Sequence, residues 1–173
     1  MLPTLAGARL TLRPQLETDL VVLGSFLGDP SLARWFGQDD ADDLRSSDAA
    51  STRSEIDDQA FTIEVMGDVA GWMLVAEEPH PDYREAGLDI MLGPAFQDRG
   101  LGPEALRLAI RWLFEERDHH RVTIDPAVAN ARAVAAYRAV GFRDIGIARR
   151  SARTPDGDWE DSLLMDLLDG ELT

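Results

Sequence analysis

The stretch "FQDRGLGPEALRLAIRWLF", residues 96–114, joins a glycine-rich turn to a long amphipathic segment. Gly100 and Gly102 flank one leucine, and Pro103 follows directly. Apolar residues then recur at helical spacing, which predicts a helix over Leu101–Arg117. A helix N-terminus carries unpaired N–H groups and a partial positive charge, so glycines there let the backbone approach an anion. A tight strand-to-helix turn without a ligand explains the same spacing equally well.

The segments on either side of this stretch predict further strands and helices. The strands before and after the helix need a parallel crossover, whereas residues 60–77 read as an antiparallel hairpin. We therefore expect a mixed α/β sheet with helices on both faces. The expected order is a strand at 8–14, helices at 17–29 and 30–36, strands at 60–65, 69–77 and 85–93, the helix at 101–117, a strand at 121–125, a helix at 130–140, and strands at 142–148 and 159–168.

Length and composition set further limits. The chain has 173 residues and is 45% hydrophobic, so we expect a single domain over 1–173. The absence of cysteine excludes disulfides, thiol nucleophiles and zinc–thiolate clusters. We see no signal-peptide pattern and no apolar run of membrane-spanning length, and so expect a cytoplasmic protein without membrane contact. The acidic segment 37–58 is expected to be a solvated loop with a helical end.

The charge balance points to the kind of partner. The net charge is −15, and all 17 basic residues are arginine. This excludes a Schiff-base lysine and the lysine of a phosphate-binding P-loop, and it argues against nucleic acid. It suits a cationic partner, although solubility alone explains it too. His80, His119 and His120 lack metal-ligand spacing, so we expect no metal, and we expect His119 and His120 to lie in a solvated turn.

Two motifs carry a resemblance to a known family. Gln97–Gly102, "QDRGLG", resembles the Q/R-x-x-G-x-G/A signature of the GNAT superfamily of acyl-CoA N-acyltransferases. Asn130–Phe142, "NARAVAAYRAVGF", is similar to that family's N-x-x-A-x-x-x-Y-x-x-x-G-F segment. The stretches "GLDIMLGPAFQDRGLG" and "VTIDPAVANARAVAAYRAVGF" together look like the aminoglycoside 6'-N-acetyltransferases and related siderophore acyltransferases. Those antibiotic-modifying enzymes carry a longer, tryptophan-rich segment where this chain has only "EEPHPDYRE".

The resemblance implies a GNAT fold. This fold has a central mixed, mostly antiparallel sheet of six to seven strands, with a splay between strands 4 and 5 and helices on both faces. The reaction it implies is direct attack of an amine on acetyl-CoA, whose pantetheine fills the splay and whose pyrophosphate meets the N–H groups of the glycine turn. The coenzyme-binding residues implied by the resemblance are Met91, Leu92, Gln97, Asp98, Arg99, Gly100, Leu101, Gly102, Pro103, Asn130, Ala133 and Tyr137.

The same resemblance makes Tyr137 a proton donor to the departing thiolate, although the bare sequence also allows a core tyrosine. Asp89 alternates with apolar neighbours in its strand and should project from the opposite face. Asp125 ends the next strand, so both carboxylates are expected beside the acetyl group, where they bind a cation and relay a proton through water. A turn aspartate is the other interpretation of Asp125. Glu85 is an alternative base, and Trp35 is placed near the acceptor.

We therefore expect an N-acetyltransferase that moves an acetyl group from acetyl-CoA to a cationic small-molecule amine, aminoglycoside-like or polyamine-like. Two alternatives stay open. One is a protein N-terminal or ribosomal-protein acetyltransferase, a class that also has the early L-x-L-R-P strand found at Leu10–Pro14. The other is a non-catalytic coenzyme A sensor. A monomer and a homodimer are both compatible with the sequence.

Overall fold

The computed structural model describes residues 2–36 and 57–173, over which the chain forms an 8-stranded sheet in the order β1-β2-β3-β4-β5-β6-β8-β7. The strands are β1 (Leu5–Ala6), β2 (Thr11–Pro14), β3 (Asp57–Val65), β4 (Asp68–Glu77), β5 (Ala86–Leu92), β6 (Arg121–Ile124), β7 (Arg143–Arg153) and β8 (Trp159–Leu168). The α-helices are α1 (Leu20–Leu27), α2 (Pro30–Ala33), α4 (Leu101–Glu115) and α5 (Ala131–Arg138), and short 3-10 helices η1 (Glu17–Asp19) and η2 (Pro94–Phe96) precede α1 and the glycine turn.

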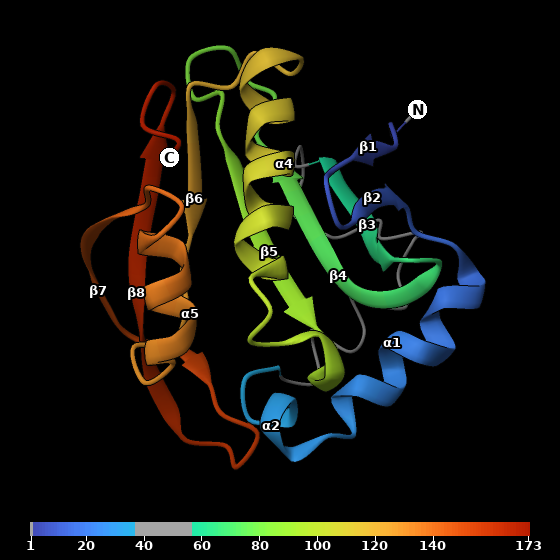
Figure 1. Ribbon diagram of the computed structural model, residues 1–173. Coiled ribbons are helices and arrows are strands. Elements are labelled where there is room, and N and C mark those ends of the chain that lie inside the picture. Colours follow the sequence, from blue (N-terminus) through green and yellow to red (C-terminus); the bar gives the residue numbers. More distant parts are fainter. Residues whose placement is uncertain (1, 37–56) are drawn as a thin grey trace.

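One strand pair opens the sheet. All neighbouring strands pair antiparallel except β5 and β6, which are parallel and are paired at Ala86–Val122 and Gly87–Thr123. Beyond Gly87, β5 continues to Leu92 and the two strands diverge (Figure 1). The predicted mostly antiparallel mixed sheet is thus confirmed. The predicted splay between the fourth and fifth strands corresponds to β5 and β6 here, because β1 precedes the strands that the sequence predicts. The short β1 adds one strand to the seven that the sequence patterns predict.

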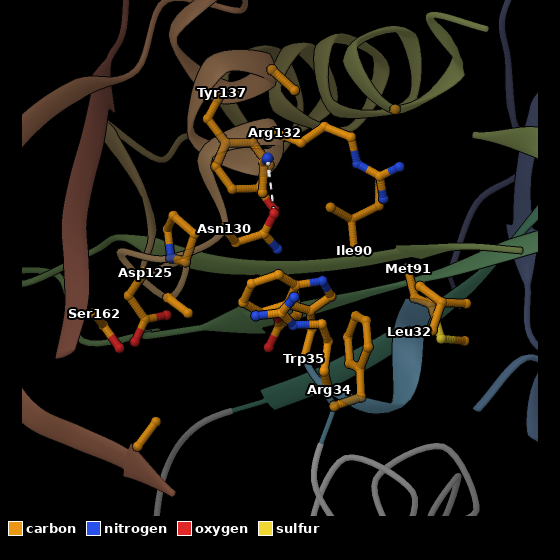
Figure 2. A pocket seen from close by; sticks show the side chains of 18 of the residues that line it. Leu32, Arg34, Trp35, Ile90, Met91, Asp125, Asn130, Arg132, Tyr137 and Ser162 are labelled. Atoms are coloured by element: carbon orange, nitrogen blue, oxygen red, sulfur yellow. Dashed lines mark hydrogen bonds between the residues drawn. The ribbon is translucent and has the colours of Figure 1, made fainter. Parts of the chain in front are cut away.

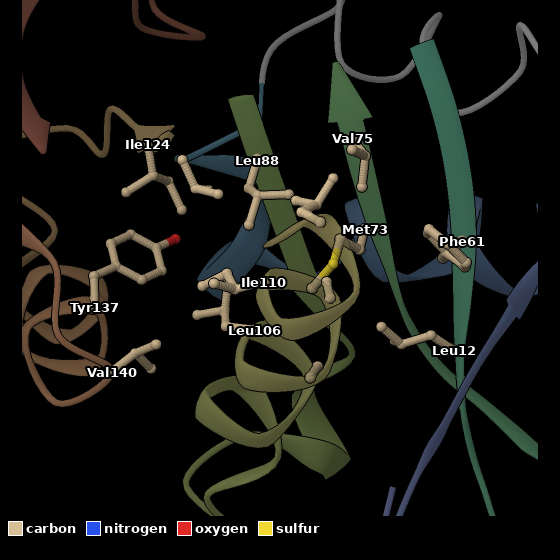
Figure 3. Close-up of a cluster of buried hydrophobic side chains, with 14 of the residues drawn as sticks. Leu12, Phe61, Met73, Val75, Leu88, Leu106, Ile110, Ile124, Tyr137 and Val140 are labelled. Carbon is tan, nitrogen blue, oxygen red and sulfur yellow. The ribbon is translucent and has the colours of Figure 1, made fainter. Parts of the chain in front are cut away.

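Helices cover both faces of this sheet, as predicted. Alternate residues of β4 serve the two faces: Met73 belongs to the large core under α4 and α5, while Trp72 belongs to a smaller cluster under α1 and α2. The large core contains the apolar stripe of α4, and Figure 3 shows Leu106 and Ile110 of that stripe facing the sheet. The burial of both faces fixes the sheet between two helical layers, so the split between the central strands β5 and β6 is supported from each side.

A buried ion pair ties the start of α1 to the sheet. Asp19 is 4% exposed, and its carboxylate accepts hydrogen bonds from both terminal nitrogens of Arg13 at 2.7 and 2.9 Å. Thr62 on β3 donates a third bond at 2.7 Å. These bonds, that from Arg13 above all, lower the pKa of Asp19 from 3.8 to about 2. The ionised form of Asp19 therefore stabilises the folded state.

Replacing Asp19 with Asn is expected to lower the free energy of unfolding at neutral pH by about 3 kcal/mol, because it removes the buried carboxylate and leaves Arg13 with only the ion pair to Glu64 at 2.7 Å. Since the folded-state pKa is depressed, Asp19 stabilises the protein above pH 3.8, and this contribution of about 2 kcal/mol is lost as the pH falls toward 2. Urea unfolding between pH 2 and 7 measures both effects, with the exposed Glu17→Gln change as control. An equally steep acid loss in Asp19→Asn would assign it to another carboxylate.

One sequence prediction about the histidines is wrong. His119 is 4% exposed and does not lie in a solvated turn. Its Nε2 lies 2.7 Å from Oε2 of Glu77, a buried carboxylate that also accepts hydrogen bonds from Arg117 and Gln59. The acidic segment just before His119 gave a local hydrophilic pattern, whereas its partner Glu77 lies 42 residues away. The segment 37–56 lies outside the described residues.

Candidate active site

A cavity of about 1120 Å³ opens where β5 and β6 diverge. Residues from every surrounding layer line it: the end of α2, the second half of β5, the glycine turn with the start of α4, the segment after β6, the inner face of α5, and the β7–β8 hairpin. The split in the sheet is what allows side chains from its two faces to meet in one space. Figure 2 shows Tyr137 and Trp35 on opposite walls of this cavity.

The glycine turn forms one end of the cavity. Gly100 adopts the left-handed conformation, with φ of 72°, and precedes α4 directly. Gly102 has room for a Cβ, whose nearest neighbour would be Leu92 Cδ1 at 3.6 Å. The side chain of Gln97 is occupied with the chain itself, because its Nε2 donates to the Leu92 carbonyl at 2.9 Å. The first N–H groups of α4 have no partner within the helix, so this end of the cavity suits an anion.

Helix α5 supplies the neighbouring wall. The Asn130 side chain accepts a hydrogen bond from the Ala133 amide at 3.2 Å, which makes Asn130 the N-cap of α5 (Figure 2). Arg132 lies 3.6 Å from the carboxylate of Asp98, in the glycine turn, so an ion pair spans the space between the two helix starts. Two helix N-termini and one guanidinium thus border the same end of the cavity.

Tyr137 lies further along α5, at the open part of the sheet. Its ring packs edge-on against Phe142, with centroids 6.1 Å apart, and only 8% of the residue is exposed. Burial raises the pKa of Tyr137 well above the ordinary value of 10, and the negative charges of Asp89 and Asp125 raise that pKa further. The phenol is therefore a proton-bearing group throughout the working pH range.

The two predicted aspartates reach the cavity from adjacent strands. Asp89 stands opposite Leu74 of β4 and is exposed to the cavity, while its neighbours Leu88 and Ile90 face the large core. Asp125 follows β6 directly, and partial burial raises the pKa of its carboxyl. Figure 2 places Asp125 near Ser162. The structure thus brings Asp89, Asp125 and Tyr137 to the lining of one cavity.

Aromatic and cationic side chains form the opposite end. Trp35 lines the cavity with the Arg34 guanidinium 4.1 Å from its ring centroid. Trp159 lines it from the β7–β8 hairpin, with Arg153 at 5.1 Å. Arg34, Arg153 and Ser162 were not predicted from the sequence. Arg34 lies beside the predicted Trp35, whereas Arg153 and Ser162 reach the site only through the tertiary pairing of the hairpin. No local pattern in residues 148–162 marks Arg153 or Ser162 as site residues.

Two predicted residues do not line the cavity. The Glu85 carboxylate lies at the paired end of β5 and forms an ion pair with Arg121 at 2.7 Å. The Arg99 guanidinium lies over the ring of Phe96, 5.9 Å from its centroid. Both residues lie in segments that contribute other residues to the cavity, but these contacts hold their side chains outside it.

Two further findings concern the nature of the site. Among the described residues, no group of three or more His, Cys, Asp or Glu side chains is arranged to hold a metal ion. Within 2–36 and 57–173, no helix has the length and apolar character needed to cross a membrane.

Comparison with known families and proteins decides the classification. The family model described as an acetyltransferase (GNAT) domain matches residues 9–143. The chain belongs to this GNAT acetyltransferase family. A curated relative of this GNAT chain, the aminoglycoside N(6')-acetyltransferase type 1 of Klebsiella pneumoniae, is 27% identical over 165 residues, covering 85% of this chain and 78% of the relative.

Two other comparisons extend this GNAT assignment. The spermidine N(1)-acetyltransferase of Escherichia coli K12 is 28% identical over 135 residues, covering 76% of this chain and 71% of that protein. The solved structure of Mycobacterium smegmatis RimJ in complex with CoA-disulfide superposes with a TM-score of 0.84 at 23% identity, covering 98% of this chain and 89% of that one. The GNAT fold implied by the sequence motifs is therefore confirmed.

Proposed function

We propose that this GNAT acetyltransferase transfers the acetyl group of acetyl-CoA to a primary amine of a cationic small molecule. The observation that carries the proposal is the convergence of Asp89, Asp125 and the protonated Tyr137 in the cavity that begins at the N-terminus of α4. The curated relatives named above act, by their names, on aminoglycosides and spermidine, which are polycationic amines.

The cavity has the features that acetyl-CoA requires. The N–H groups of Gly100, Leu101 and Gly102 suit its pyrophosphate, and no Cβ stands at Gly102 to keep a phosphate away. The divergence of β5 from β6 exposes backbone groups of Leu88–Leu92 to which pantetheine amides can add as an extra strand. Acetyl-CoA supplies the thioester carbonyl that the amine attacks, and a backbone N–H near Met91 is proposed to polarise it.

The side chains then have separable roles. The amine nitrogen attacks the carbonyl carbon, the carbon–sulfur bond breaks, and Tyr137 donates its phenolic proton to the departing thiolate. The amine loses its proton through water to the carboxylate side of the cavity, at Asp89 and Asp125. An ordinary carboxyl, with a pKa of about 3.9, is too weak a base to deprotonate an alkylammonium by itself. Electrostatic binding of the cation is therefore the main role of both aspartates.

A peptide amine is the second candidate acceptor. Arg34 and Arg153 line the far end of the cavity and offer cationic groups that a pure polycation does not use. They suit an acceptor that carries a carboxylate or carbonyl groups close to its amine, as a protein N-terminus does. A protein N-terminal acetyltransferase would then use the same coenzyme site and the same Tyr137.

Replacing Asp125 or Asp89 with Asn is expected to raise KM for spermidine roughly tenfold while leaving KM for an uncharged-side-chain peptide nearly unchanged, because each change keeps the shape and removes one charge. Added salt should weaken spermidine binding in wild type more than in either variant. Because the pKa of Asp125 is raised, spermidine KM should fall as the pH rises through it, and Asp125→Asn should lack this dependence.

Thiol release from acetyl-CoA measures these effects, with the exposed loop change Asp82→Asn as control. Equal losses on both acceptors without a salt effect would contradict the cationic acceptor. Acetylation of the peptide but not of spermidine would favour the second candidate. A wild-type chain that binds coenzyme A and acetylates no amine would be a coenzyme sensor.

A further inference from the structure

Arg9 binds the glycine turn from outside the cavity. It lies between β1 and β2, and its guanidinium donates hydrogen bonds to the carbonyl oxygens of Arg99 at 2.8 Å and Gly100 at 3.2 Å. Its Nε donates to Glu104 at 2.6 Å, and its own backbone amide donates to the same carboxylate at 2.8 Å. Arg9 is not among the residues that line the cavity.

Because the peptide bond is planar, the position of these two carbonyl groups also fixes the direction of the N–H groups that follow them. In a trans peptide the C=O and the following N–H point in opposite directions. Because Arg9 holds the carbonyls of Arg99 and Gly100, the N–H groups of Gly100 and Leu101 are directed away from Arg9. Both residues line the cavity. One guanidinium thus fixes two adjacent peptide planes with their donors on the side where the phosphate site is expected.

The surroundings hold Arg9 in this position. Gly100 has a left-handed backbone, which favours glycine, and a Cβ there would lie in contact with an Arg9 nitrogen at 3.4 Å. Burial alone would raise the pKa of Glu104, but hydrogen bonds from the Arg9 amide and side chain outweigh it and lower that pKa. The ionised Glu104, itself in the first turn of α4, therefore orients the guanidinium at neutral pH.

We propose that Arg9 is a positioning residue for the coenzyme's phosphates: it sets their affinity by orienting the Gly100 and Leu101 N–H groups and touches neither substrate. This inference rests on the proposed function, because it presumes that the phosphates lie at the glycine turn. A purely structural role, in which Arg9 only ties the β1–β2 connection to α4, predicts a different result.

The test compares a thioester that has phosphates with one that lacks them. Arg9→Met keeps the aliphatic length and removes all side-chain donors, while the backbone N–H to Glu104 remains. It should weaken coenzyme A binding roughly 10- to 100-fold, while kcat at saturating acetyl-CoA stays within about twofold. Turnover of S-acetylpantetheine, which has no phosphate, should be unchanged. Arg9→Lys, with one ammonium in place of the fork, should fall between wild type and Arg9→Met. Arg111→Met, an exposed change of equal charge on α4, is the control.

The outcomes separate the two ideas. Calorimetry gives the coenzyme A affinity, and thermal unfolding shows which variants are folded. Equal losses with acetyl-CoA and S-acetylpantetheine, or unchanged coenzyme A affinity in folded Arg9→Met or Arg9→Lys, would overturn the positioning role. Failure of the wild-type chain to bind coenzyme A would instead overturn the proposed function, and this inference with it.

Discussion

Replacing Tyr137 with Phe is expected to lower kcat by roughly 10- to 10³-fold, with little change in coenzyme affinity. The change keeps the ring that packs against Phe142 and removes one proton and one oxygen. A thiol has an ordinary pKa of about 8.5 and a phenol one of about 10, so the proton transfer to a departing thiolate is uphill even before burial. Burial makes the free enzyme's phenol a still weaker acid.

The proposed acceptor would make the Tyr137 phenol a stronger acid again. The carboxylates of Asp89 and Asp125 contribute to the raised pKa of Tyr137. The proposed cationic amine, bound beside them, would offset their charge and lower the pKa of the phenol toward the value that burial alone sets. Under the proposed mechanism, Tyr137 would therefore be a better proton donor when a cationic acceptor is bound.

The measurement is steady-state turnover, together with calorimetric binding of coenzyme A. The chain has 2 tyrosines, and the other, Tyr83, is 69% exposed, so Tyr83→Phe is a matched control that should leave both quantities unchanged. The pH profile of wild type should show no tyrosine limb in the range where the fold is stable. Full turnover in Tyr137→Phe would make Tyr137 a core residue and assign protonation of the thiolate to solvent.

Local patterns in the sequence were sufficient to predict most of the fold. Helix α4 followed from apolar spacing and from Pro103 in its first turn, and its observed end at Glu115 lies two residues before the predicted Arg117. The β3–β4 hairpin was predicted from two strand patterns separated by residues 66–68. In the structure, Met66 and Gly67 of this connection both take positive φ. The two-residue β1 could not be predicted, because a strand that short has no periodicity and forms through its pairing with β2.

The candidate site could be predicted only where residues act near their own position in the chain. The cap at Asn130 and the glycine turn are local features, and Asp89 followed from strict alternation in β5. Arg9 contacts residues 90 and more positions away, and no spacing rule links it to them. Glu85 shows the converse: its residue type suits a base, but Arg121 on the next strand holds its carboxylate outside the cavity.

Replacing Gly102 with Val is expected to weaken coenzyme A binding by roughly 100-fold or more, because a branched Cβ at the first turn of α4 displaces a phosphate from the N–H groups. The structure makes Gly102 a cleaner site for this test than Gly100. A side chain at Gly100 would be strained by the backbone φ of 72° and would also contact Arg9. A loss of coenzyme binding in a Gly100 variant would therefore have more than one cause.

At Gly102, by contrast, an added Cβ makes only an ordinary contact with Leu92, and the residue has helical backbone. Valine is less favourable than alanine in a helix by less than about 1 kcal/mol, so the variant should still fold. The expected loss is therefore in coenzyme A affinity and not in stability. Gly146→Val is the control: it lies in β7, where an added Cβ meets open space. Calorimetry with coenzyme A decides the matter. Wild-type affinity in a folded Gly102→Val variant would show that the phosphates bind elsewhere, whereas the loss without a change in unfolding temperature would place them at the start of α4.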